Sequence, residues 1–127
     1  MEFSLTSEQE MLIESARAFA EKELYPYESE VEASDEVRPE LVDQIRQRAI
    51  EKGFYAVNMP ESLGGGGLDC VSLSLVEREL DRANFALQYL VGRPSNILQA
   101  CVGEQRERYL FPCIRGEKTD CLAMTEP

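Results

Sequence analysis

Hydrophobic residues recur at intervals of three and four along most of this 127-residue chain, and short polar or glycine-containing breaks separate the repeats. Such spacing is typical of amphipathic helices that bury one face. The pattern therefore predicts an all-α fold, a helical bundle of about five helices. The residues expected to face the core are Leu12, Ala16, Phe19, Ala20 and Leu24; Leu41, Val42, Ile45, Ala49 and Ile50; Leu73, Val76, Leu80, Ala83 and Leu87; and Tyr109, Leu110 and Ile114.

Capping residues predict where several of these helices begin and end. Thr6 and Gln9 have the spacing of a capping box, and Asp69 is suited to the N-cap of the third helix. The first helix is expected to end near Tyr25, leaving residues 28–35 as either a frayed extension or a loop. Lys52 and Gly53 then form a stop signal for the second helix, which opens with proline at residue 39.

The later helices are less regular. Asn84 interrupts the third repeat, and the apolar segment 85–102 after it predicts a fourth helix. Pro94 must kink or divide that helix, because proline removes a backbone donor and clashes with the preceding turn. The fifth helix is expected over residues 104–115.

Four consecutive glycines at residues 64–67 mark a non-helical crossing between the second and third helices. Each glycine costs about 1 kcal/mol relative to alanine inside a helix. No strand precedes the run and no Gly-Lys-Ser/Thr follows it, which excludes a phosphate-binding loop. Whether it is a ligand loop or only a connection stays open at this stage, although four glycines suggest a loose loop.

The last residues change character. Residues 119–124 are strand-like, and a lone strand cannot satisfy its own backbone groups. Either this segment is a disordered tail or the chain stops just as a sheet begins, and its apolar composition favours the second interpretation. We therefore expect a helical domain over residues 1–118 and the start of a truncated β-domain over residues 119–127.

Composition narrows the function classes. The net charge of −11 argues against nucleic acid, whose phosphates would repel the chain. There is no histidine, and the four cysteines form no CxxC pair, so a zinc site is not expected. No apolar run reaches the length of about 20 residues that spans a bilayer. The N-terminus resembles neither an export signal nor a transit peptide, so a cytoplasmic protein with free thiols is expected.

Five short motifs follow one another along the chain: FSLTSEQ at 3–9, PESLGG with GLD at 60–69, LVEREL at 75–80, GEQRERYL at 103–110 and LAMTEP at 122–127. Taken together, they resemble the start of an acyl-CoA dehydrogenase. In that family the glycine crossing reads PEEYGGxGLD, and the last motif belongs to a flavin signature that continues towards Gly-Ser-Asp. One match would be weak, but five in order cover nearly the whole chain.

The resemblance implies a flavin enzyme that dehydrogenates an acyl-CoA thioester at its α and β carbons, with FAD as cofactor. By position, Leu122, Ala123, Met124 and Thr125 would line the flavin, with the Thr125 hydroxyl as the best candidate donor to the ring. The acyl pocket would be walled by residues 89–96. Its implied members are Tyr89, Arg93, Ser95 and Asn96.

The family's catalytic glutamate lies in a domain that these residues do not contain. No catalytic residue is therefore assigned, and the 127 residues alone are expected to be inactive. Glu77, Glu79, Glu104 and Glu126 are expected to be surface or capping carboxylates. Arg93 would either pair with a polar group of the substrate or form a structural ion pair.

The resemblance further implies an electron-transfer flavoprotein or similar acceptor as partner, and a homotetramer. Two alternatives stay open. One is a non-catalytic helical interaction module derived from the same family by truncation. The other is an acyl-CoA oxidase or nitroalkane oxidase, because these enzymes share the helices and differ in oxygen access to the flavin.

Overall fold

The computed structural model describes residues 4–121, and within them the chain is all-α, as the hydrophobic spacing predicts. No strand occurs among these residues. The α-helices are α1 Ser7–Phe19, α2 Glu28–Ser34, α3 Pro39–Glu51, α4 Cys70–Leu80, α5 Phe85–Gln88 and α6 Phe111–Ile114. Wider π-helical turns cover Ala20–Leu24 and Arg106–Leu110, and 3₁₀ turns cover Tyr25–Tyr27, Glu61–Leu63, Tyr89–Val91 and Asn96–Ala100.

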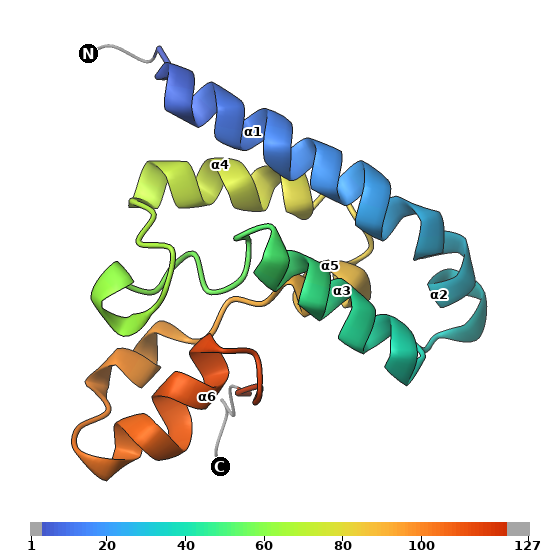
Figure 1. Cartoon of the computed structure of the whole chain (residues 1–127). Helices are drawn as coiled ribbons and strands as arrows, with labels where there is room; N and C mark the ends of the chain where they lie inside the picture. Colours follow the sequence, from blue (N-terminus) through green and yellow to red (C-terminus); the bar gives the residue numbers. More distant parts are fainter. Residues whose placement is uncertain (1–3, 122–127) are drawn as a thin grey trace, which may run out of the picture.

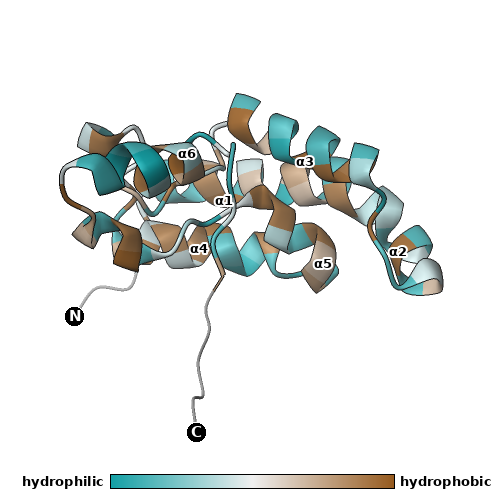
Figure 2. Cartoon of the chain, turned by 90° about the horizontal axis from the view of Figure 1, so that it is seen from below, coloured by the Kyte–Doolittle hydropathy of each residue, from teal (hydrophilic) through white to brown (hydrophobic). Residues whose placement is uncertain are grey.

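The main core lies where α1, α3 and α4 meet. Helices α1 and α4 lie side by side, and α3 packs below them in the view of Figure 1. Figure 2 shows hydrophobic and hydrophilic residues interleaved along α3, as expected for a helix with one buried face. The rings of Phe19 and Phe54 meet in this core, with centroids 5.2 Å apart and planes tilted by 57°. The apolar segment that follows α3 therefore packs into the bundle.

The predicted caps are present. Thr6 Oγ1 accepts the Gln9 N–H at 3.2 Å, and Gln9 Oε1 accepts the Thr6 N–H at 3.1 Å. Beyond α1 the backbone stays helical through a π turn and a 3₁₀ turn into α2, so residues 28–34 are a helix rather than a loop. Asp35 ends α2 in the left-handed region, with φ +56°.

Two residues expected in the core are exposed. On α3 the buried positions are Leu41, Ile45 and Ala49, spaced by four, and Ile50 lies about 100° further round the helix. Ile50 is accordingly 45% exposed. Tyr109 is 44% exposed while Leu110 is fully buried, because the π turn over Arg106–Leu110 changes the register of the fifth helix.

The glycine crossing is tightly packed, not loose. A Cβ on Gly65 would lie 2.2 Å from the Met59 carbonyl oxygen, and one on Gly66 would lie 2.9 Å from Val57 Cα. The backbone N–H of Gly66 donates to Ala56 and that of Gly67 to Met59. The glycines are needed because the backbone folds back on residues 56–59, so the crossing is a structural connection.

A second, smaller cluster attaches the last helical turns to the bundle. It consists of Ala56, Met59, Leu110 and Ile114. This cluster anchors the segment 106–116 below the glycine crossing and leaves residues 89–96 between the two packed regions (Figure 1). None of the described helices is both long and apolar enough to cross a bilayer.

The predicted C-terminal strand is not tested by the described residues. Thr119 to Cys121 form no regular element, and the rest of that segment lies outside the described residues. The division into domains at residue 118 stays a prediction.

Candidate functional site

The four residues assigned to the acyl pocket lie together on one open cleft of about 570 Å³. Tyr89, Arg93, Ser95 and Asn96 line it on one side, and residues of α4 and α5 line the other. The remaining lining residues are Glu77, Asp81, Phe85, Gln88, Asp120 and Cys121. The cleft brings the end of α4 and the start of α5 next to residues 120–121, which are about 40 positions further along the chain.

Breaks in the fourth helix shape this cleft. The Asn84 side chain accepts the Ala86 N–H at 2.9 Å and starts α5. The helix then tightens into the 3₁₀ turn Tyr89–Val91 and stops at Gly92, which has φ +86° and ψ +107°. Pro94 follows, so the predicted helix over 85–102 is divided, as proline at this position requires. Residues 92–95 therefore form no regular element, and Arg93 and Ser95 among them line the cleft.

The apolar part of the cleft wall is an aromatic pair. Phe85 and Tyr89 are one helical turn apart, with ring centroids 6.1 Å apart and planes tilted by 38°. Their side chains are 78% and 56% exposed. Large aromatic side chains are usually at least partly buried, and neighbouring exposed ones are typical of a binding surface.

Charged groups form the rest of the wall. Arg93 Nη1 lies 2.6 Å from Glu77 Oε1, so the arginine forms an ion pair within the chain. The Ser95 N–H donates to the Asp120 carboxylate at 3.2 Å, and the Tyr89 hydroxyl donates to the Asp120 carbonyl at 3.4 Å. Both contacts hold the segment that follows Lys118 against the cleft.

Asn96 is positioned by a residue of the glycine crossing region. Asn58 Nδ2 donates to Asn96 Oδ1 at 2.8 Å and to the Pro94 carbonyl at 2.7 Å. Asn58 therefore holds the irregular segment 92–96 near Pro94 and Asn96. The hydrophobic pattern gave no signal for this residue, because an asparagine in a loop carries no periodicity.

Glu79 was expected on the surface, and this expectation is wrong. Its side chain is only 3% exposed and contacts three guanidinium groups, from Arg17 on α1 and from Arg78 and Arg82 beside it. The hydrogen bond from Arg17, and then those from Arg78 and Arg82, lower its pKa to about 2 from an ordinary value near 4.5. Glu79 is a structural carboxylate and does not line the cleft.

The residues assigned to the flavin, Leu122, Ala123, Met124 and Thr125, lie outside the described residues. The described chain stops at Cys121, which lines the cleft. Among residues 4–121, no group of three or more histidine, cysteine, aspartate or glutamate side chains is arranged to hold a metal ion.

Relatives of known activity match almost the whole chain. It is 36% identical to the 3-(aryl)acrylate reductase of Clostridium sporogenes over 96% of this chain and 33% of the relative. It is 36% identical to a subunit of the caffeyl-CoA reductase–Etf complex of Acetobacterium woodii, over 95% of this chain and 33% of the relative. It is 30% identical to the bovine mitochondrial short-chain specific acyl-CoA dehydrogenase, over 93% of this chain and 29% of the relative. The chain thus spans about a third of the length of these relatives.

A solved structure has the same fold. It is described as "Electron transferring flavoprotein of Acidaminococcus fermentans: Towards a mechanism of flavin-based electron bifurcation". The matching chain is 30% identical with a TM-score of 0.69, over 91% of this chain and 31% of that chain. The family model for the acyl-CoA dehydrogenase N-terminal domain matches residues 6–117. The chain therefore belongs to the acyl-CoA dehydrogenase family, in the part that forms its N-terminal helical domain.

Proposed function

We propose that these residues are the N-terminal helical domain of a flavin-dependent acyl-CoA dehydrogenase, and that the cleft beside α5 is part of its acyl-pocket wall. The observation that carries this proposal is the meeting of Tyr89, Arg93, Ser95 and Asn96 on one cleft. The exposed aromatic pair supplies the apolar surface that an acyl chain needs.

The segment 119–121 supports the assignment of the flavin site. Asp120 is tied to Ser95 and Tyr89, so the chain leaves the described region beside the cleft, directly before Leu122. Bound FAD would accept the hydride from the acyl β-carbon. The part of Phe85 and Tyr89 would be to bind and orient the acyl group and to exclude water. The α-proton would go to a base outside these residues.

The ion pair between Arg93 and Glu77 supports the structural one of the two roles considered for the arginine. A guanidinium already bonded to a carboxylate has less to offer a substrate carboxylate or phosphate. We therefore assign Arg93 a structural role, in which it holds residues 92–95 against α4.

The direct test uses the purified product of the gene that encodes these residues, under anaerobic conditions. We expect bound FAD whose visible absorbance falls when a saturated acyl-CoA is added, because the flavin is reduced. A product that folds but binds no flavin would contradict the proposal and would favour the non-catalytic interaction module instead.

A second candidate function is the reverse reaction, the reduction of an α,β-unsaturated acyl thioester. It is favoured by the two relatives that are 36% identical, both of which are named as reductases. The same preparation distinguishes the directions. A reductase reoxidises its reduced flavin rapidly with an unsaturated thioester, whereas a saturated thioester bleaches it slowly.

The name of the Acetobacterium relative contains Etf, and the related solved structure is described as an electron transferring flavoprotein. We include an electron carrier of that kind as the expected partner. Co-purification of the gene product with such a carrier would support this partner, and electron transfer to an artificial dye alone would contradict it.

A further inference from the structure

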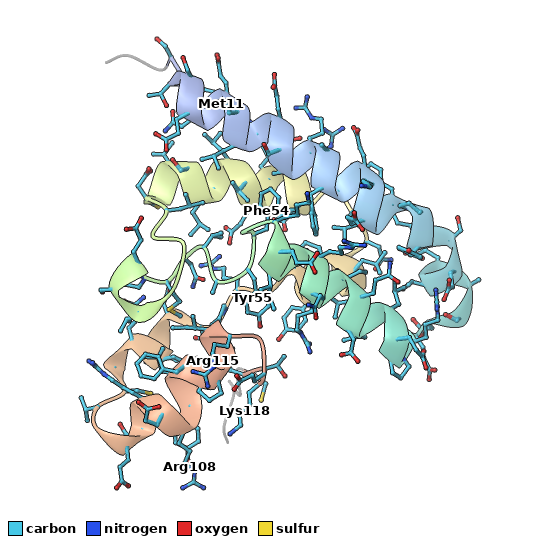
Figure 3. The ribbon with its side chains drawn as sticks, viewed as in Figure 1. Met11, Phe54, Tyr55, Arg108, Arg115 and Lys118 are labelled. Carbon is cyan, nitrogen blue, oxygen red and sulfur yellow. The ribbon has the colours of Figure 1, made fainter. Side chains whose placement is uncertain are left out.

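A second cleft, of about 200 Å³, adjoins the first and shares Tyr89, Arg93 and Asp120 with it. Its other polar lining residues are Arg46 of α3, Tyr55 after α3, and Lys118 and Thr119 near the end of the described residues. Figure 3 shows Tyr55 between α3 and the C-terminal segment, with Lys118 below it. Three cations thus line one small cleft of a chain whose net charge is −11.

Arg46 forms no hydrogen bond or ion pair with any residue in the range 4–121. By contrast, Arg48 on the same helix pairs with Glu51 at 3.2 Å. A guanidinium carries five N–H donors. Arg46 is partly exposed, so its donors face solvent at the cleft and are available to a ligand.

Tyr55 provides a second unused donor in the same cleft. Its ring packs on Gly92, where an added Cβ would lie 1.8 Å from Tyr55 Cε2, and this contact fixes the ring. Burial raises the pKa of the Tyr55 phenol, so the hydroxyl stays protonated at neutral pH and can donate. Its oxygen has no hydrogen-bond partner within the described part of the chain.

Arg46 and Tyr55 approach the same point from two elements. A Cβ built on Gly116 would lie 3.4 Å from both Arg46 Cδ and Tyr55 Cζ. The positive charge of Arg46 also acts on the Tyr55 phenol, where it opposes the effect of burial on the pKa. Both residues line the same small cleft, and a guanidinium and a phenol are N–H and O–H donors of the kind that bind the two oxygens of a carboxylate.

The other lining residues select the kind of oxyanion. The Asp120 carboxylate borders the cleft and would repel a dianion such as hydrogen phosphate more strongly than a monoanion. Leu90, Pro94 and the Tyr89 ring add an apolar wall that a short hydrocarbon group can contact.

The geometry points to a binding site for the carboxylate group of a small organic acid, with Arg46 and Tyr55 as its donors. This inference is independent of the proposed function, because it concerns the 127-residue chain alone and no flavin chemistry. Lys118 adds positive charge at the edge of the cleft, where one of its three N–H groups donates to the Arg108 carbonyl at 3.1 Å.

The test is an NMR titration of the isotopically labelled 127-residue chain with butyrate, uncharged butyramide and inorganic phosphate. We expect butyrate to shift the Arg46 Nε–H and the Gly92 amide signals in a saturable way, and butyramide to leave them unchanged. Phosphate should bind more weakly than butyrate. Phosphate binding as tight as butyrate, or no saturable shift with butyrate, would overturn the inference.

Matched variants distinguish binding at this cleft from a general effect of removing one positive charge. Arg46→Gln should weaken butyrate binding at least about tenfold, as expected for the loss of a charge-assisted hydrogen bond. Arg48→Gln makes the same change of charge on the same helix and should leave the affinity unchanged. Equal effects of the two variants would overturn the inference.

Tyr55→Phe is the second variant, because it keeps the ring on Gly92 and removes only the hydroxyl. It should weaken butyrate binding by about threefold or more. The backbone amide spectrum of α4 reports whether each variant is folded. If Arg46→Gln disturbs the fold, an unchanged affinity in Tyr55→Phe would count against the site.

Discussion

Arg17 on α1 donates its Nε–H to Glu79 Oε2 on α4 at 3.0 Å, across 62 positions of sequence. The Glu79 side chain is 3% exposed, whereas Arg17 is 45% exposed. Arg78 and Arg82 complete the shell at 2.9 and 3.2 Å. One carboxylate, surrounded by three guanidinium groups, thus joins α1 to α4, the two helices that pack side by side in the bundle.

Glu79→Gln should destabilise the fold by about 1–3 kcal/mol, because a buried carboxylate loses charge-assisted hydrogen bonds. The three arginines are about half exposed, so water can hydrate them in the variant. The loss of stability is therefore smaller than that of leaving a buried charge without a partner. Urea denaturation measures the effect. Glu51→Gln removes an exposed partner of Arg48 and should change stability by less than about 1 kcal/mol. Equal costs for both variants would exclude a special role for Glu79.

The same carboxylate predicts how stability depends on pH. Its pKa in the folded chain is about 2, below the ordinary 4.5, so the unfolded chain takes up a proton first as pH falls. The contribution of Glu79 is complete above about pH 4.5 and is lost as pH falls towards 2. The free energy of unfolding should change less with pH across this window in Glu79→Gln than in the parent chain. A parallel pH dependence in the two chains would contradict this prediction.

Gly92→Ala should destabilise the chain by about 2–4 kcal/mol. The new Cβ would overlap Tyr55, and φ +86° with ψ +107° is a conformation that side chains disfavour. Gly103→Ala is the matched control, since Gly103 also has positive φ, +52°, but nothing within 4 Å of an added Cβ. The control should cost only about 1 kcal/mol. If chemical denaturation gave equal losses of stability for the two variants, the Tyr55 ring would move aside at little cost and the prediction would be contradicted.

Asp69→Ala should cost about 1 kcal/mol through loss of the α4 N-cap. Asp69 Oδ1 accepts the Val71 and Ser72 N–H groups at 2.8 and 3.1 Å, and Oδ2 accepts the Ser72 hydroxyl at 2.7 Å. The hydrogen bonds from Ser72 lower the pKa of Asp69. Asp69→Asn keeps the acceptor that caps the helix and should cost less. Thermal unfolding of both variants checks this order, and a larger loss for asparagine would contradict it.

Local signals in the sequence were sufficient for helix starts and for most of the core. Thr6 and Asp69 cap their helices as predicted, because a cap depends on residues within three positions. The position of Glu79 could not be predicted in the same way. Its principal partner, Arg17, approaches it only when α1 packs on α4. In the local sequence, a glutamate between two arginines is typical of an exposed helix face.

The family motifs pointed to residues 89–96, and the four named residues line one cleft, whose role as an acyl pocket stays a prediction. Asp120 and Asn58 were missed because contacts between distant segments bring them to Ser95 and Asn96. Phe85 was missed although it lies one helical turn before Tyr89. The glycine run was interpreted as loose because composition reports freedom in the unfolded chain, whereas its packing on Val57 and Met59 depends on the folded backbone.

The central claim is that the Tyr89 face of the cleft contacts the acyl group, and substrate discrimination tests it most directly. The measurement is the ratio of kcat/KM for a long and a short acyl-CoA in the purified gene product. Tyr89→Ala should change this ratio by at least about fivefold, whereas Tyr109→Ala, on a different exposed surface, should not. An unchanged ratio in Tyr89→Ala, or the same change in Tyr109→Ala, would contradict the assignment of this cleft to the acyl pocket.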